Sequence, residues 1–144
     1  MMKKYLVAAA ALAIAGGAYL ALDSGSTPDV QAKAPAEGDP MVAVSLPDSL
    51  SSNAQMGQRA FDAVCTDCHG ASGSGKLGFG PPLIHKIYEP SHHGDLSFLA
   101  AVQNGVRAHH WKFGDMPPVE GLTPSDVINI VAYVREIQRV NGIQ

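Results

Sequence analysis

The five residues Cys65-Thr66-Asp67-Cys68-His69 decide how the rest of this sequence is interpreted. On one helical turn this spacing brings two thiols to the same side and places an imidazole directly after them. Two thiols placed in this way can form thioethers with two neighbouring vinyl groups of a haem, and the histidine can then bind the iron. The motif therefore predicts one covalently attached haem c, held by Cys65, Cys68 and His69.

Two other chemistries use a Cys-x-x-Cys spacing, and the sequence favours neither. A structural zinc site would need two further ligands, but the chain has only two cysteines. His92 or His109 would then have to be recruited at irregular spacing. A thioredoxin-like redox pair would lie within a βαβ pattern, and no such pattern surrounds these residues.

A helical pattern precedes the motif. Ser52 and Gln55 fit a capping box, so we expect a helix that begins at Ser52 and runs directly into Cys65. Four side chains at helical spacing should form its apolar face: Met56, Ala60, Phe61 and Val64.

Two more helices are expected after the motif, beyond a glycine-rich loop over residues 70–82. One should run from Asp95 to the stop signal at Asn104-Gly105. The other should have Thr123 as its N-cap and Pro124 at its first position, and should end before Gly142. Its apolar face should consist of Val127, Ile130, Val131, Val134 and Ile137. With no strand pattern, the sequence predicts an all-α domain over residues 51–144.

The first 50 residues have a different character. Lys3 and Lys4 precede an apolar run, Tyr5–Leu22, so residues 1–22 are expected to be a signal peptide or an N-terminal membrane anchor. Residues 23–50 are rich in Pro, Ala, Ser and Asp and contain no aromatic residue, which predicts a flexible linker. Either form of the N-terminal segment would place the domain on the periplasmic side of a bacterial inner membrane, anchored through residues 5–22 or soluble.

The charge of the chain excludes one class of partner. The formal net charge is −3, and from Ser51 onward the chain contains eight acidic and seven basic residues. The domain is therefore nearly neutral, and it has no basic run or stripe. This composition argues against nucleic acid as a partner.

Four places outside the motif give the chain a resemblance to class I cytochromes c, a monohaem family. Gly57 and Phe61 match the Gly-x-x-x-aromatic pattern of the family's N-terminal helix. Gly80-Pro81-Pro82-Leu83 is similar to its Gly-Pro-x-Leu turn, and Gly114-Asp115-Met116-Pro117 to the loop that presents the distal methionine. Tyr133 matches the aromatic residue of the C-terminal helix, which in the family crosses the N-terminal helix near its glycine. The resemblance covers roughly Ala54 to Gln138.

The resemblance implies roles for further residues. Met116 would be the second iron ligand opposite His69; the other methionines lie in the N-terminal segment, in the predicted linker or, for Met56, on the helix before the motif. His109 and His110 are the rival ligands. The Pro81 carbonyl would accept a hydrogen bond from the His69 ring. The Trp111 indole N–H would reach a haem propionate, unless Trp111 is an ordinary core residue.

Two pairs of histidines, His92-His93 and His109-His110, flank the expected middle helix. The family pattern does not require them. Surface and loop-capping histidines are one interpretation, and a second metal site, with copper as the best candidate, is the other.

The sequence thus predicts an electron carrier that passes single electrons between redox-partner proteins. No acid–base pair or nucleophile is visible, and Met116 would close the distal iron position, so we do not expect an enzyme. One alternative is a haem subunit of a membrane-bound dehydrogenase or oxidase complex. Another is a haem-based sensor or a copper-handling protein that uses the histidine pairs.

Overall fold

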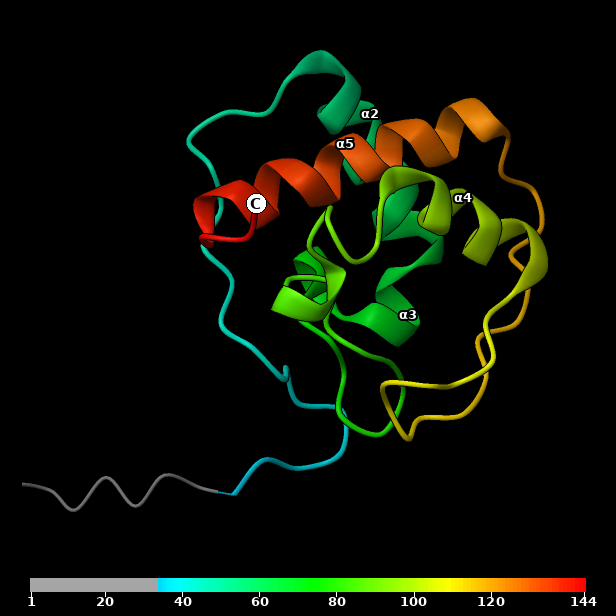
Figure 1. The fold of residues 1–144 in the computed structure, drawn as a ribbon. Helices are drawn as coiled ribbons and strands as arrows, with labels where there is room; N and C mark the ends of the chain where they lie inside the picture. The colour runs from blue at the N-terminus through cyan, green and yellow to red at the C-terminus, as the bar shows by residue number, and fades with distance from the viewer. Residues whose placement is uncertain (1–33) are drawn as a thin grey trace, which may run out of the picture. The chain divides into compact units, whose positions relative to one another are not determined.

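The computed structural model describes residues 34–144, in which the chain forms four α-helices joined by loops and short 3₁₀ turns (Figure 1). The helices are α2 (Ser52–Val64), α3 (Thr66–His69), α4 (Asp95–Asn104) and α5 (Pro124–Val140). Strand-like pairing in these residues is limited to two isolated bridges, Lys76 with Gly80 and Val106 with Met116. The predicted all-α fold is confirmed.

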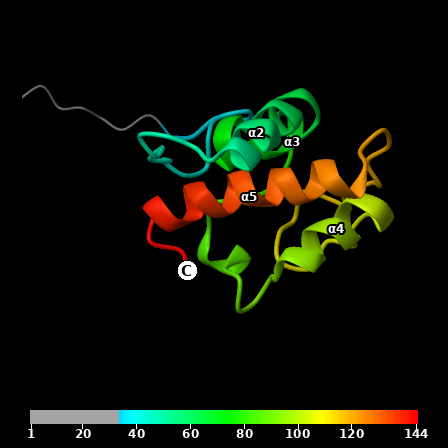
Figure 2. The same ribbon diagram turned by 90° about the horizontal axis from the view of Figure 1, so that it is seen from above.

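Helix α5 is the centre of the fold. Seen from above, α2 and α3 lie on one side of α5 and α4 lies on the other (Figure 2). A Cβ on Gly57 of α2 would be 1.8 Å from the Asn129 carbonyl oxygen of α5, so the two backbones approach closely only because residue 57 is glycine. Phe61 packs against Tyr133 with their ring centroids 5.6 Å apart. The predicted crossing of these two helices near Gly57 is confirmed.

The N-cap of α2 differs from the prediction by one residue. Ser51, not Ser52, is the cap, and its hydroxyl accepts a hydrogen bond from the Ala54 backbone N–H at 3.2 Å. The Glu136 carboxylate of α5 accepts hydrogen bonds from the Ser51 backbone N–H at 3.1 Å and from its hydroxyl at 2.6 Å. Glu136 therefore supplies the acceptor that the predicted capping box assigned to Gln55.

The buried face of α2 also differs in part. Phe61 is fully buried and Ala60 packs against the core, as predicted, but Met56 and Val64 are each 43% exposed. The buried residues Ala54, Gly57 and Phe61 recur at steps of three and four and face α5. Met56 lies outside this stripe, whereas Val64 continues it at the last residue of α2, where the stripe is no longer covered.

Helix α5 matches its prediction closely. The Thr123 hydroxyl accepts from the Asp126 backbone N–H at 3.2 Å, and the Asp126 carboxylate accepts from the Thr123 backbone N–H at 2.9 Å. All five residues of the predicted apolar face are buried: Val127, Ile130, Val131, Val134 and Ile137. Helix α4 also has the predicted bounds.

The compact unit begins earlier than the predicted domain, at Pro35 rather than residue 51. The backbone N–H of Gly38 donates to Leu77 O at 2.8 Å, and that of Met41 donates to Ser74 O at 3.2 Å. The Ser45 backbone and the Asn141 side chain exchange two hydrogen bonds. The later part of the predicted linker is therefore attached to the domain by hydrogen bonds and by Val42, Val44 and Leu50, which pack against the core.

The predicted export segment, residues 1–22, and the first part of the predicted linker lie outside the described residues. In residues 34–144 no helix is both long enough and apolar enough to cross a membrane.

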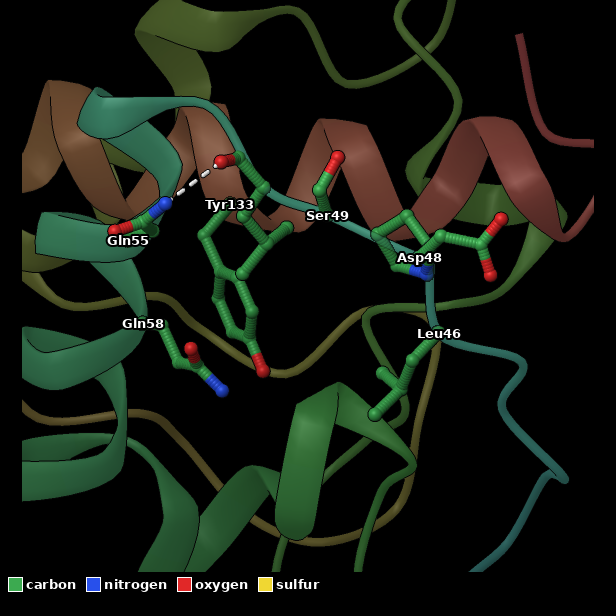
Figure 3. A pocket seen from close by; sticks show the side chains of 8 residues that line it. Leu46, Asp48, Ser49, Gln55, Gln58 and Tyr133 are labelled. Atoms are coloured by element: carbon green, nitrogen blue, oxygen red, sulfur yellow. Dashed lines mark hydrogen bonds between the residues drawn. The ribbon is translucent and has the colours of Figure 1, made fainter.

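A pocket of about 240 Å³ lies where residues 46–50 pass over Tyr133 (Figure 3). The Gln55 side-chain amide donates to the Leu50 carbonyl at 2.9 Å and fixes this segment on α2. The pocket is lined by Leu46, Pro47, Asp48, Ser49, Leu50, Gln55, Gln58 and Tyr133. The lining includes none of the predicted haem-binding residues, so this pocket is separate from the candidate haem site.

Candidate functional site

The Cys65–His69 motif continues the helical path of α2 into α3. The Cys65 backbone N–H donates to Phe61 O at 2.8 Å, and the His69 backbone N–H donates to Cys65 O at 2.9 Å. Both cysteines are free thiols; Cys65 is half-buried and Cys68 is exposed. Two thiols three residues apart on one turn lie on neighbouring parts of the same face, as the prediction of two thioethers requires.

The thiol of Cys65 has the opposite character from a redox-active cysteine. Burial raises its pKa to about 11, and the charges of Cys68 and Asp62 add to the rise. A thioredoxin-like pair depends on a lowered thiol pKa, because the thiolate is the reacting form. Cys65 is held as a neutral thiol at pH 7, which argues against the redox-pair interpretation.

The ring of His69 is fixed in one orientation. Its Nδ1 lies 2.9 Å from the Pro81 carbonyl oxygen, and because a carbonyl can only accept, Nδ1 carries the proton. Burial lowers the pKa of His69, and the bond to Pro81 only partly opposes this. The imidazole is therefore neutral, and its Nε2 keeps a lone pair for a metal. The predicted contact between Pro81 and His69 is present.

The turn that carries Pro81 lies tightly against α3. A Cβ on Gly80 would be 2.5 Å from the Cys68 carbonyl oxygen, so glycine is required for this approach. Lys76 pairs with Gly80 across the loop, and the Leu83 backbone N–H donates to Gly73 O at 2.8 Å. These bonds, together with the buried side chains of Pro82, Leu83 and Ile84, place the Pro81 carbonyl beside His69.

Met116 lies in the segment that returns from α4 towards α5. Its backbone exchanges two hydrogen bonds of 2.9 Å with Val106, and its side chain is half-buried. Pro117 and Pro118 follow it and are exposed. The backbone of Met116 is thus fixed, while iron ligation by its sulfur stays a prediction. The rival ligands, His109 and His110, are exposed on the surface.

Met41 was set aside as an iron ligand because it lies in the predicted linker. In the structure Met41 belongs to the folded unit, so that reason no longer applies. Its sulfur packs against Gly75, so closely that a Cβ on that glycine would be 3.0 Å away. The Gly75 backbone N–H in turn donates to His69 O at 2.7 Å. Met41 therefore supports the loop that follows His69 and does not lie in the segment of Met116.

Trp111 carries a polar atom without a partner. Its indole Nε1 is buried and makes no hydrogen bond, although burial of such a group costs free energy unless it is paired. Burial raises the pKa of the Tyr88 phenol, and the nearby indole of Trp111 limits this rise. The two side chains nevertheless lack the geometry of a hydrogen bond. An unpaired N–H at this place fits the predicted contact with a haem propionate.

Arg135 is the residue that the sequence analysis missed. It is buried within α5 and donates to the carbonyl oxygens of Tyr88 and His93, while its Nε forms an ion pair with Asp95 at 2.9 Å. Its guanidinium also lies over the Phe98 ring, 5.0 Å from the centroid. The sequence did contain a signal for this residue: Arg135 is a charged residue directly after Val134, within the apolar face of α5, and a charged residue in such a place is rarely buried without a partner.

The comparison with known families decides the identity of the fold. The profile of the cytochrome c family matches residues 54–138, more than half of the chain. The chain belongs to the cytochrome c family. Neither the curated proteins nor the solved structures contain a significant match.

Membership of the cytochrome c family implies covalent haem c and electron transfer at the haem iron. The local structure fits that group in three respects: two free thiols on one turn, a neutral imidazole with an open Nε2, and an unpaired indole N–H. Cys65, Cys68 and His69 would hold the haem, with Pro81 orienting His69 and Trp111 facing a propionate.

Proposed function

We propose that this cytochrome c is a monohaem electron carrier that passes single electrons between redox-partner proteins on the periplasmic side of an inner membrane. The observation that carries the proposal is the state of His69. Its ring is held by the Pro81 carbonyl at 2.9 Å and is neutral through burial, as an axial ligand that must not move requires.

The role of the protein is to keep the iron ligands in place. The haem, when bound, supplies an iron that accepts and releases one electron. His69 is oriented by Pro81, and the backbone of Met116 is held by two bonds to Val106. Pro117 and Pro118 limit the freedom of the chain beside Met116. Ligands that stay in place in both redox states keep the reorganisation on electron transfer small.

The distal ligand is tested by replacing Met116 in full-length, haem-loaded protein. Met116→Ala should open the distal position, lower the reduction potential and let carbon monoxide bind the reduced haem, because a thioether favours Fe(II). Met56→Ala is the matched control, since Met56 is 43% exposed on α2, and it should behave as wild type. If wild-type protein binds carbon monoxide rapidly, Met116 is not a firm ligand and a haem-based sensor becomes the better function.

Covalent attachment is tested separately. Haem should remain on the wild-type chain through acid–acetone extraction and denaturing electrophoresis, because thioethers survive both treatments. Cys68→Ala should greatly reduce the yield of haem-loaded protein. Release of haem from the wild-type chain would contradict a c-type attachment.

The location of the protein is proposed from the sequence of residues 1–22. N-terminal sequencing of the mature protein, combined with cell fractionation, tests it. A chain that retains Tyr5–Leu22 in the membrane fraction is the anchored form. A start near Asp23 or Pro35 in the periplasm is the soluble form, and cleavage before Pro35 would leave the compact unit intact. A full-length chain in the cytoplasm contradicts both forms.

A further inference from the structure

The two histidine pairs, separated in sequence by α4, come together in the structure. His92 and His93 lie in the turn before α4, and His109 and His110 lie in the segment after it. The ring centroid of His110 is 5.3 Å from that of His92 and 5.3 Å from that of His93. Four imidazoles from two segments therefore form one cluster, away from the Cys65–His69 motif in sequence.

Three of these rings present their nitrogens to one another. One ring nitrogen each of His92, His93 and His110 lies within 4.8 Å of the other two. The Nε2 atoms of His92 and His110 are 3.4 Å apart. Two imidazole nitrogens bound to one tetrahedral ion at about 2.0–2.1 Å are separated by about 3.4 Å. The spacing of this pair is thus already that of two ligands on a shared metal ion.

A second observation shows which atom of His93 is available. Its Nδ1 lies 2.7 Å from the Ile87 carbonyl oxygen, so Nδ1 carries the proton and Nε2 keeps the lone pair. Metal-binding histidines commonly donate their other ring N–H to a backbone carbonyl in this way. His93 therefore has the tautomer of a ligand before any ion is present.

The scaffold around the cluster is held in place on both sides. Buried Arg135 donates to the His93 carbonyl oxygen and is paired with Asp95, and this fixes the turn that carries His92 and His93. On the other side, the Asp115 carboxylate accepts from the Ala108 backbone N–H at 2.8 Å, just before the second histidine pair. The imidazoles are thus presented by ordered backbone.

The chemistry of the ligands indicates which ions the cluster would bind. A neutral imidazole is the form that binds a metal, and an all-imidazole ligand set without cysteine suits Cu²⁺ or Zn²⁺ better than Mg²⁺ or Ca²⁺. His109 differs from the other three because it does not belong to the group of converging nitrogens, although its Nδ1 also lies near a carbonyl oxygen, that of Arg107, at 2.8 Å.

We propose that His92, His93 and His110 bind one imidazole-preferring divalent transition-metal ion on the surface of the domain. Cu²⁺ should bind most tightly and Zn²⁺ next, in the usual order of affinity. His92 and His110 are exposed, so the ion can enter directly from solvent. The site uses none of the residues assigned to the haem. An experiment can therefore disprove metal binding by these histidines without bearing on the proposed electron transfer.

The test is titration of full-length, haem-loaded protein with Zn²⁺ by calorimetry and with Cu²⁺ by electron paramagnetic resonance. Wild type should bind one ion per chain, with nitrogen ligands visible in the Cu²⁺ spectrum. His110→Gln and His93→Gln should each weaken binding by about tenfold or more, the size of effect that even supporting residues of metal sites show. The haem absorption spectrum should stay unchanged and so show that each variant is folded.

His109→Gln is the matched control, because it removes the neighbouring imidazole from the same segment but none of the three converging nitrogens. Its affinity should stay close to wild type. Loss of binding as large as in His110→Gln would overturn the assignment of ligands. Weak binding of several ions to wild type would overturn the site itself and return the histidines to ordinary surface residues.

Discussion

The crossing of α2 and α5 and the loops on either side of α4 are ordered by different means. At the crossing, Gly57 lets the two backbones touch and Phe61 packs on Tyr133, so apolar contact fixes the geometry. In the loops, Tyr88 and Leu122 contact the core, and polar bonds add to these contacts. The loops are held by Arg135 reaching from α5 and by the backbone pairing of Val106 with Met116. The loop after α4 also contains the unpaired indole N–H of Trp111, for which a haem propionate would be a partner.

The largest expected effect on stability comes from adding a side chain at residue 57, where α2 crosses α5. Gly57→Val should destabilise the domain by about 3 kcal/mol or more, because its side chain would overlap the Asn129 carbonyl and overpacked sites relax poorly. Urea unfolding of the haem-loaded protein measures this. Ala63→Val, at an exposed position of the same helix, should cost only about 0.5 kcal/mol from helix propensity. Equal losses in the two variants would show that the close approach is not required.

The loops should respond to Arg135 instead. Arg135→Ala leaves the His93 carbonyl oxygen without its Arg135 donor, leaves the Tyr88 carbonyl oxygen with Gln138 as its remaining donor, and removes the ion pair with Asp95. The loss should be about 2–3 kcal/mol. Hydrogen exchange should quicken at the His93 amide, which donates to Glu89, well before it quickens in α2. Arg139→Ala is the control, because Arg139 is exposed and its ion pair with Glu136 is 3.8 Å long. Uniform loss of protection across the domain would contradict a local role.

A smaller effect is expected at the start of α5. Thr123→Ala removes the hydroxyl that accepts from the Asp126 backbone N–H and should cost about 1 kcal/mol, the usual value for an N-cap. Thermal unfolding of the haem-loaded protein measures the loss. Ser125→Ala, exposed one residue beyond Pro124, should change stability much less.

The pH dependence of the same cap gives the smallest effect. Hydrogen bonds from the Thr123 hydroxyl and backbone N–H lower the pKa of Asp126 below its ordinary value of 3.8. A carboxyl group with a lowered folded-state pKa stabilises the fold fully above its unfolded pKa and loses that contribution as the pH falls through the folded value. The stability difference between wild type and Thr123→Ala should therefore shrink below about pH 3.8. A difference that stays constant down to pH 2 would contradict a contribution from the charge of Asp126.

The sequence by itself determined the features that depend on neighbours along the chain. The motif spacing, the bounds of α4, and the Thr123 cap and buried face of α5 all follow from contacts one to four residues apart, because helical geometry repeats at that interval. The family resemblance added Pro81, whose carbonyl contacts His69 as expected.

Only the tertiary structure decided which distant groups meet. Glu136 completes the cap at Ser51 across 85 residues, and Arg135 reaches back to the turn of His93. The structure also attached residues 35–50 to the domain and brought His110 to His92. These contacts join segments whose separation in the sequence follows no period, so no local pattern predicts them. They depend on how α2 and α4 pack against α5.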